Sequence, residues 1–222
     1  MTKREWLWRL IHNITDGQIS IVTFCRDFTR IYNLEVDYDE LSKEEHLAFG
    51  ALSAIAGRFS EFEEDLEKYP DVYASEADVR AQAKKILSQF PNAEERPRKN
   101  QIQRVAKLDD KALLHRYVAK IDGAKIQTKH DYLSAMEKAL GLPPCQDNWD
   151  SYDDWMTDLW WIPNGKIALV FYHCSAMLQN DPQTKELVFD IFQSHILPFW
   201  EEEVKHVIVG GEPKEFQVYL VD

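Results

Sequence analysis

Through about the first 90 residues, apolar positions recur every three or four residues, which is the spacing of amphipathic helices. Capping-box pairs, in which a Ser or Thr precedes an acid by three residues, mark three helix starts. These pairs are Thr2 with Glu5, Ser42 with Glu45, and Ser75 with Asp78. A further helix follows Asp16 and Gly17. The pattern predicts an antiparallel four-helix bundle with short connections.

The third of these helices is predicted to be long. After Ser42, apolar positions at steps of three or four predict a buried stripe, and Pro70 ends the helix. The stripe consists of Leu52, Ile55, Phe59 and Phe62. Four acids, Glu61, Glu63, Glu64 and Asp65, then lie near the predicted C-terminal end. Because negative charge is unfavourable at a helix C-terminus, we do not expect these acids to stabilise the helix.

The pattern changes after residue 90. A basic, weakly apolar stretch over residues 93–112 predicts a linker between two domains, residues 1–92 and residues 113–222. Beyond the linker, strands are predicted at residues 117–121, 167–172 and 216–221, and helices at 128–140, 149–160 and 182–200. Parallel strands need crossover connections, which the helices supply. The second domain is therefore predicted to be α/β with a three-stranded parallel sheet, giving an α plus α/β chain.

The 222 residues carry a formal net charge of -12, unlike the basic surface of a nucleic-acid-binding protein. The acids are concentrated in two stretches. Residues 35–78 contain 14 acidic and three basic residues, and residues 147–158 contain five aspartates and no basic residue. A solvated surface explains such stretches most simply, and a surface complementary to a basic partner is the alternative.

Motifs of enzymes, cofactors and metals are missing from the sequence. The chain has no glycine-rich phosphate loop, no HExxH and no GxSxG. Cys25, Cys145 and Cys174 form neither CxxC pairs nor a disulfide framework. No apolar run reaches the roughly 20 residues of a membrane span, and the N-terminus lacks a secretory signal. We therefore expect a cytoplasmic protein that is not an enzyme, uses no cofactor or metal, and binds neither nucleic acid nor membrane.

The second domain resembles the barstar family of ribonuclease inhibitors over residues 115–222. The resemblance begins at the strand and turn of Lys120-Ile-Asp-Gly123, and its most specific part runs from Asp147 to Leu159. The family pattern has Asn-Trp-Asp there, a second Asp four residues after the first, and a Thr or Asp further along. The matching residues are Asn148, Trp149, Asp150, Asp154, Thr157, Asp158 and Leu159.

This resemblance implies a protein that covers a ribonuclease active site. A ribonuclease presents Arg, Lys and His to phosphates, and carboxylates on one helix face can occupy the phosphate positions. The implied contact residues are Asn148, Trp149, Asp150, Asp153, Asp154, Trp155, Thr157 and Asp158. Trp149, Tyr152 and Trp155 flank the acids as possible apolar anchors. Packing on the sheet is the favoured role for Trp149 and Trp160, while Trp155 fits either role.

The first domain, over residues 4–90, is similar to the colicin D immunity family of small helical bundles. The similarity rests on Arg58-Phe-Ser-Glu-Phe-Glu-Glu-Asp65 and on Ser75-Glu-Ala-Asp-Val-Arg80. It implies that acidic residues fill the basic substrate groove of a transfer-RNA-cleaving toxin. The implied residues are Glu61, Glu63, Glu64 and Asp65.

Two inhibitor-like domains on one chain indicate an immunity protein of a polymorphic or contact-dependent toxin system. The expected partner is a basic nuclease toxin domain, which the protein neutralises by steric and electrostatic cover. The alternative is an acidic regulator of a housekeeping RNA-processing enzyme, with one domain acting only as a scaffold. The sequence leaves the oligomeric state open.

Overall fold

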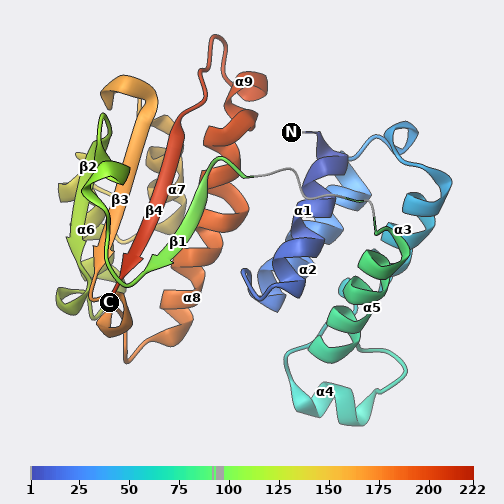
Figure 1. Ribbon diagram of the computed structural model, residues 1–222. Helices are drawn as coiled ribbons and strands as arrows, with labels where there is room; N and C mark the ends of the chain where they lie inside the picture. Colours follow the sequence, from blue (N-terminus) through green and yellow to red (C-terminus); the bar gives the residue numbers. More distant parts are fainter. Residues whose placement is uncertain (1, 92, 94–97) are drawn as a thin grey trace. The chain divides into compact units, whose positions relative to one another are not determined.

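The computed structural model describes residues 2–91, 93 and 98–222. The chain forms two compact units, Met1–Pro97 and Arg98–Asp222, the first helical and the second a sheet with helices (Figure 1). Arg96 and Pro97, which belong to the predicted linker, lie outside the described residues. Among the described residues, no helix has the length and apolar character needed to cross a membrane.

Five α-helices make up most of the described part of the first unit. They are α1 (Lys3–Thr15), α2 (Ile21–Arg30), α3 (Lys43–Ala56), α4 (Glu63–Lys68) and α5 (Glu76–Gln89). A π-helical turn, Ile31–Glu35, extends α2, and a 3-10 turn, Tyr38–Glu40, precedes α3. The predicted capping boxes at Thr2, Ser42 and Ser75 are confirmed, because each side chain accepts a hydrogen bond from the backbone three residues later.

The core of the first unit is formed by side chains of α1, α2, α3 and α5. Its fully buried members include Leu7, Leu10, Phe24, Phe28, Phe49, Leu52, Val79 and Ile86. A buried carboxylate, Glu45, joins α1 to α3: it accepts hydrogen bonds from Trp8 Nε1 at 2.8 Å and from Arg4 Nε at 2.9 Å. Since Glu45 also completes the capping box of α3, one carboxylate both caps a helix and links two helices.

The long helix predicted from Ser42 to Pro70 is wrong beyond Ala56. There α3 ends, with Gly57 as C-cap, because the N–H groups of the next two residues turn back to carbonyls three residues earlier. Phe59 forms a parallel bridge with Ala74, which closes residues 59–74 into a loop that carries α4 (Figure 1). Phe62, a predicted core residue, is 63% exposed. Apolar residues thus continue at helical spacing after Ala56, although the backbone there no longer continues α3.

The second unit contains one sheet of four parallel strands in the order β1-β4-β3-β2. The strands are β1 (Gln101–Val105), β2 (Tyr117–Asp122), β3 (Lys166–Tyr172) and β4 (Glu215–Val221). The helices are α6 (Lys129–Leu140), α7 (Trp149–Asp158), α8 (Pro182–Ile191) and α9 (Val204–Val207). Two π-helical turns, Phe192–Ile196 and Phe199–Glu203, lie between α8 and α9.

The predicted three-stranded sheet is wrong because the stretch predicted as a linker, residues 93–112, contains β1. This edge strand is polar and pairs with β4 through its backbone, while Gln103 Nε2 donates to Gln217 Oε1 at 2.9 Å. The side chain of Asn100 fixes the start of β1: its Oδ1 accepts from Phe216 N at 2.9 Å. Such a strand lacks the apolar run by which strands are found in a sequence.

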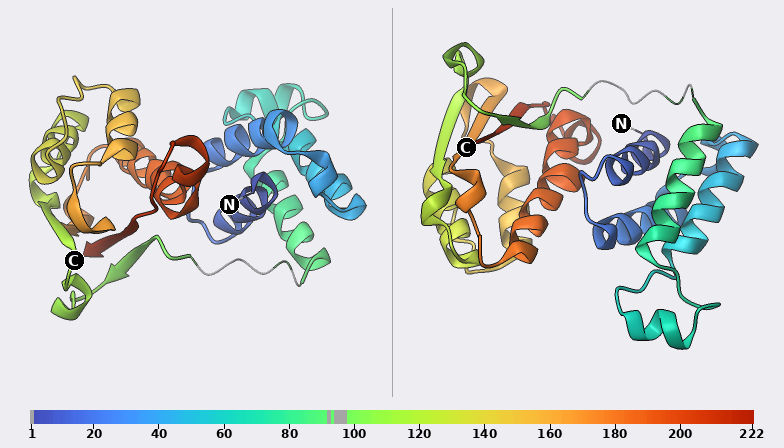
Figure 2. Two further views of the ribbon diagram at one scale, coloured as in Figure 1. Left: turned by 90° about the horizontal axis from the view of Figure 1, so that it is seen from above. Right: turned by 60° about the horizontal axis from the view of Figure 1, so that its bottom comes forward.

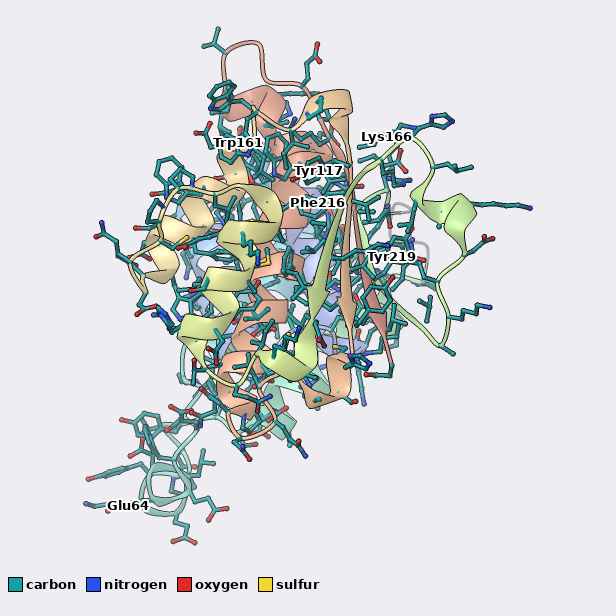
Figure 3. All side chains as sticks on the ribbon, turned by 90° about the vertical axis from the view of Figure 1, so that its left-hand side faces the viewer. Glu64, Tyr117, Trp161, Lys166, Phe216 and Tyr219 are labelled. Carbon is teal, nitrogen blue, oxygen red and sulfur yellow. The ribbon has the colours of Figure 1, made fainter. Side chains whose placement is uncertain are left out.

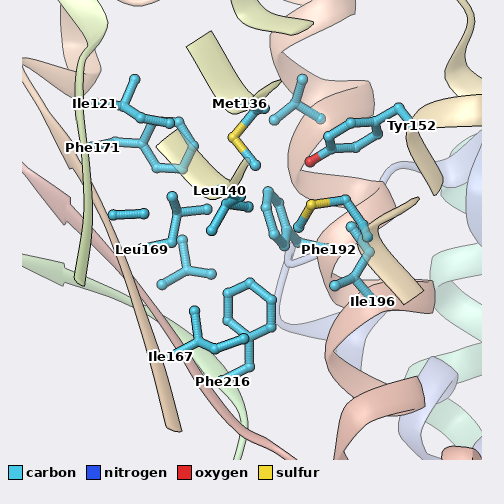
Figure 4. Packing of buried hydrophobic residues seen from close by; sticks show 14 of the residues in the cluster. Ile121, Met136, Leu140, Tyr152, Ile167, Leu169, Phe171, Phe192, Ile196 and Phe216 are labelled. Carbon is cyan, nitrogen blue, oxygen red and sulfur yellow. The ribbon is translucent and has the colours of Figure 1, made fainter. Parts of the chain in front are cut away.

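Alternation of side chains along β3 divides the sheet into two faces. Leu169 and Phe171 point into the main core beneath α6, α7 and α8, where Figure 4 shows them on the sheet side of the cluster, with Leu140 between them and Phe192 (Figures 2 and 4). Ala168 and Val170 point to the opposite face, which residues between β1 and β2 cover. The side of α7 that faces the sheet is therefore buried in the core, and its opposite side faces solvent.

Candidate functional site

The start of α7 is fixed by a network around the preceding loop. Asn148 is the N-cap, and its side chain accepts a hydrogen bond from Asp150 N at 2.9 Å. Gln146 and Asp147 both adopt positive φ angles. The carboxylate of Asp147 lies 2.8 Å from His130 Nδ1, and this hydrogen bond raises the pKa of His130 above its ordinary value. The predicted site residue Asn148 is therefore a capping residue that positions the helix.

The inward face of α7 holds the helix in one rotational setting. Tyr152 and Met156 are fully buried, and the hydroxyl groups of Tyr152 and Tyr132 lie 2.6 Å apart. Trp200 Nε1 donates to the carbonyl oxygen of Met156 at 2.7 Å. The prediction that Tyr152 flanks the binding surface is wrong, because its position on the helix faces α6 and the sheet.

Three acids at steps of four form the outer face of α7. We call Asp150, Asp154 and Asp158 the acidic stripe; all three are exposed. Side chains four residues apart lie one above another on an α-helix, and like charges at that spacing repel. Within the described part of the chain, no basic side chain forms an ion pair with these three acids. A basic partner would remove the repulsion.

Two other predicted contact residues on α7 make hydrogen bonds within the second unit. The carboxylate of Asp153 lies 2.6 Å from His195 Nδ1, so that this residue joins α7 to the π-helical turn after α8. The hydroxyl of Thr157 donates to the backbone carbonyls of Asp153 and Asp154, both at 3.0 Å. The structure therefore does not place the Asp153 carboxylate with the acidic stripe.

The four tryptophans of this region differ in exposure. Trp149 and Trp155 are half-buried and pack against the main core, and Lys129 Nζ lies 5.0 Å from the ring centroid of Trp149. Trp161 donates from Nε1 to the carbonyl of Leu140 at 2.9 Å. Trp160, predicted to pack on the sheet, is 77% exposed. That prediction is wrong because α7 ends at Asp158, so helical spacing does not apply to Trp160.

The predicted acids of the first unit lie on and before α4. Glu61, Glu63 and Glu64 are exposed, and Figure 3 shows Glu64 pointing away from its helix. Asp65 accepts a hydrogen bond from Ser60 Oγ at 2.7 Å. Three of the acids occupy the first turn of α4, where negative charge is favourable. The expectation that they lie at a helix C-terminus is therefore wrong, and local stability accounts for part of their placement.

The described residues contain no group of three or more His, Cys, Asp or Glu side chains that could hold a metal ion. Burial raises the pKa of the Cys25 thiol to about 12 and that of Cys145 to about 11. Both thiols are therefore protonated at neutral pH and unsuited to act as nucleophiles.

The second unit is an α/β domain in which the inward face of α7 is buried and its outward face carries three exposed carboxylates. Residues 116–220 match the model of the barstar family, described as Barstar (barnase inhibitor). The second unit is thus barstar-like, in agreement with the predicted resemblance. Neither the curated proteins nor the solved structures gave a match to the chain. The resemblance of residues 4–90 to the colicin D immunity family has no support from these comparisons.

Proposed function

We propose that this protein is an immunity protein that binds a basic ribonuclease toxin and covers its active site with the acidic stripe of α7. The observation that carries the proposal is the exposure of Asp150, Asp154 and Asp158 in a row on the fixed helix of a barstar-like unit. Inhibition by this route is steric and electrostatic, and the proposed role therefore requires no catalysis and no cofactor.

The chemistry of the proposed contact follows from charge and shape. Carboxylates one helical turn apart are spaced so that each can accept hydrogen bonds from an Arg, Lys or protonated His in the nuclease cleft. Because α7 is held by the buried hydroxyl pair of Tyr132 and Tyr152, little ordering cost is expected on binding. Trp149, Trp155 and Thr157 lie on the same helix and are proposed as its flanking contacts.

We propose the acids before and on α4 as a second contact with a nuclease. Glu61, Glu63 and Glu64 are exposed and lie beside the exposed ring of Phe62. If they take no part in inhibition, the first unit acts as a scaffold for the second. In either case the protein is proposed to act in the cytoplasm, where a ribonuclease toxin meets cellular RNA.

A cognate toxin gene is expected directly upstream of the gene for this protein, and a different neighbour there would count against the proposal. The experiment is an RNA cleavage assay with the ribonuclease domain of that toxin. The purified 222-residue chain should stop cleavage at one equivalent of the domain. A chain in which Asp150 and Asp154 are both replaced by Ala should require a large excess, whereas Lys166→Ala should behave as wild type. Cleavage that continues unchanged with excess wild-type chain would contradict the proposal.

A further inference from the structure

The last residue of α9 and the loop that follows it expose a short apolar run. Val207, Ile208 and Val209 are each at least half exposed, and the side chain of Val209 is fully exposed. In Figure 1 this loop extends beyond the end of α9 before the chain enters β4. Exposed apolar side chains in a row are uncommon on a soluble domain and indicate an interaction surface.

The shape of this loop is fixed by its backbone. Ile208 N donates to Val204 O at 3.1 Å, and Gly211 N donates to Ile208 O at 3.0 Å. Gly210 has a φ of +72°, and a Cβ on Gly211 would lie only 2.3 Å from Val204 O. Gly211 therefore leaves no room for a side chain, Gly210 adopts a backbone conformation that favours glycine, and the turn fixes the backbone that carries the apolar residues.

The loop lies at the same end of the sheet as the C-terminal end of α7. Because β3 and β4 are parallel neighbours, the segments that lead into them meet at one edge. Lys214 Nζ donates to the carbonyl of Ile162 at 3.4 Å, which joins the segment before β4 to the one before β3. Figure 3 shows the loop rising beyond Trp161 at this end.

Trp160 adds an aromatic ring to this end of the unit. It follows Asp158 of the acidic stripe by two residues and is 77% exposed. Its ring meets that of Trp161 edge to face, with centroids 5.9 Å apart, and Trp161 is itself hydrogen-bonded to Leu140. The exposed ring of Trp160 thus packs against a hydrogen-bonded neighbour, Trp161, and can contact a partner.

We propose that the nuclease-binding surface extends past the end of α7 onto the apolar end surface, defined as Trp160, Val207, Ile208 and Val209. The inference rests on the proposed function and adds a second kind of contact: an apolar surface of the ribonuclease beside its basic cleft. Continuity supports this occupant, because Trp160 lies only two residues after Asp158, the last acid of the stripe. Carboxylates then provide charge complementarity, while the aromatic ring and the three aliphatic side chains provide desolvated contact area.

The test measures dissociation constants between the full-length chain and the same upstream ribonuclease domain. We expect Trp160→Ala to raise the dissociation constant about tenfold or more, and Val209→Ser about fivefold. Both residues are exposed, so neither change should alter the melting temperature by more than a degree or two. The matched control is Leu114→Ser, an apolar residue of the second unit that is 61% exposed and follows the segment covering the opposite face of the sheet. It should change the constant less than twofold.

Asp154→Ala separates this inference from the proposed function. If it weakens binding while Trp160→Ala and Val209→Ser do not, the apolar end surface is overturned and the function stands. If wild-type chain does not bind the domain at all, both are overturned. Sedimentation of the free chain provides a further check: a dimer that Val209→Ser dissociates would assign the apolar end surface to a second copy and overturn the inference.

Discussion

The hydroxyl groups of Tyr132 in α6 and Tyr152 in α7 lie 2.6 Å apart, and both side chains are fully buried. Their rings also meet at an angle of 66°, with centroids 5.6 Å apart. Each hydroxyl has the other as its hydrogen-bond partner in the core beneath α7. This pair fixes the rotation of α7, and with it the direction in which the acidic stripe points.

Replacing one member of this pair should cost more than replacing both. Tyr152→Phe leaves the Tyr132 hydroxyl buried without a partner and should lower the free energy of unfolding by about 1 to 3 kcal/mol. The double change to Phe at both positions removes both polar groups and should cost less than the sum of the single changes. Urea denaturation of the four proteins measures the coupling. Strictly additive losses would show that the two hydroxyls are not coupled.

The carboxylate of Glu45 should make the first unit sensitive to acid. Burial acts to raise the pKa of Glu45, but hydrogen bonds from Arg4, Ser42 and Trp8 outweigh it and hold that pKa below its ordinary value. A lowered pKa contributes stability that is complete above the unfolded pKa of about 4.3 and is lost as the pH falls through the folded value.

Glu45→Gln removes the titrating group while keeping its size. The wild-type chain should lose more unfolding free energy between pH 6 and pH 3 than the variant, as measured by urea denaturation with circular dichroism (about 0.5 to 2 kcal/mol difference). At pH 6 the variant should be the less stable protein. Identical pH dependence in the two proteins would contradict the assigned role of Glu45.

Much of the fold could be predicted from local signals in the sequence. Capping boxes at Thr2, Ser42, Ser75 and Thr128 each begin a helix, because a side chain and a backbone group within four residues decide the outcome. The strands β2, β3 and β4 were predictable from short stretches that are rich in apolar and β-branched or aromatic residues.

The features that could not be predicted from the sequence depend on residues that are distant in the chain. The strand β1 is polar, and its pairing depends on β4, more than 100 residues later in the chain. Tyr152 was expected to flank the binding surface and is buried, whereas Trp160 was expected to pack on the sheet and is exposed. Their burial depends on where α7 ends and on the packing of α6. The acidic stripe was predictable because helical spacing alone brings its three residues together.

The acids on α4 are open to a direct test. Reversing the charge of Glu61, Glu63 and Glu64 to Lys should cost about 0.3 to 1 kcal/mol per position within the first turn of α4, and leave the buried core of the first unit folded. If the acids contact a nuclease, cells expressing this full-length variant should lose part of their protection against the toxin. Full protection together with unchanged affinity would leave the first unit as a scaffold.

Association should be steered by charge. The chain carries a net charge of -12, and the acidic stripe faces solvent. The association rate with the ribonuclease domain should fall several-fold as the ionic strength rises from about 0.05 to 0.3 M, while the dissociation rate changes much less. Stopped-flow mixing or biosensor kinetics at several salt concentrations measures both rates. An association rate that does not change with salt concentration would argue against the acidic stripe as the contact.

The affinity of Asp154→Ala for the ribonuclease domain tests the central claim most directly, because Asp154 is the middle member of the acidic stripe. Removing this carboxylate should raise the dissociation constant about 30-fold or more, equivalent to about 2 kcal/mol. The charge-matched control Glu44→Ala removes an exposed acid at the start of α3 and should raise the constant less than twofold. Equal and negligible effects of the two substitutions would contradict the account.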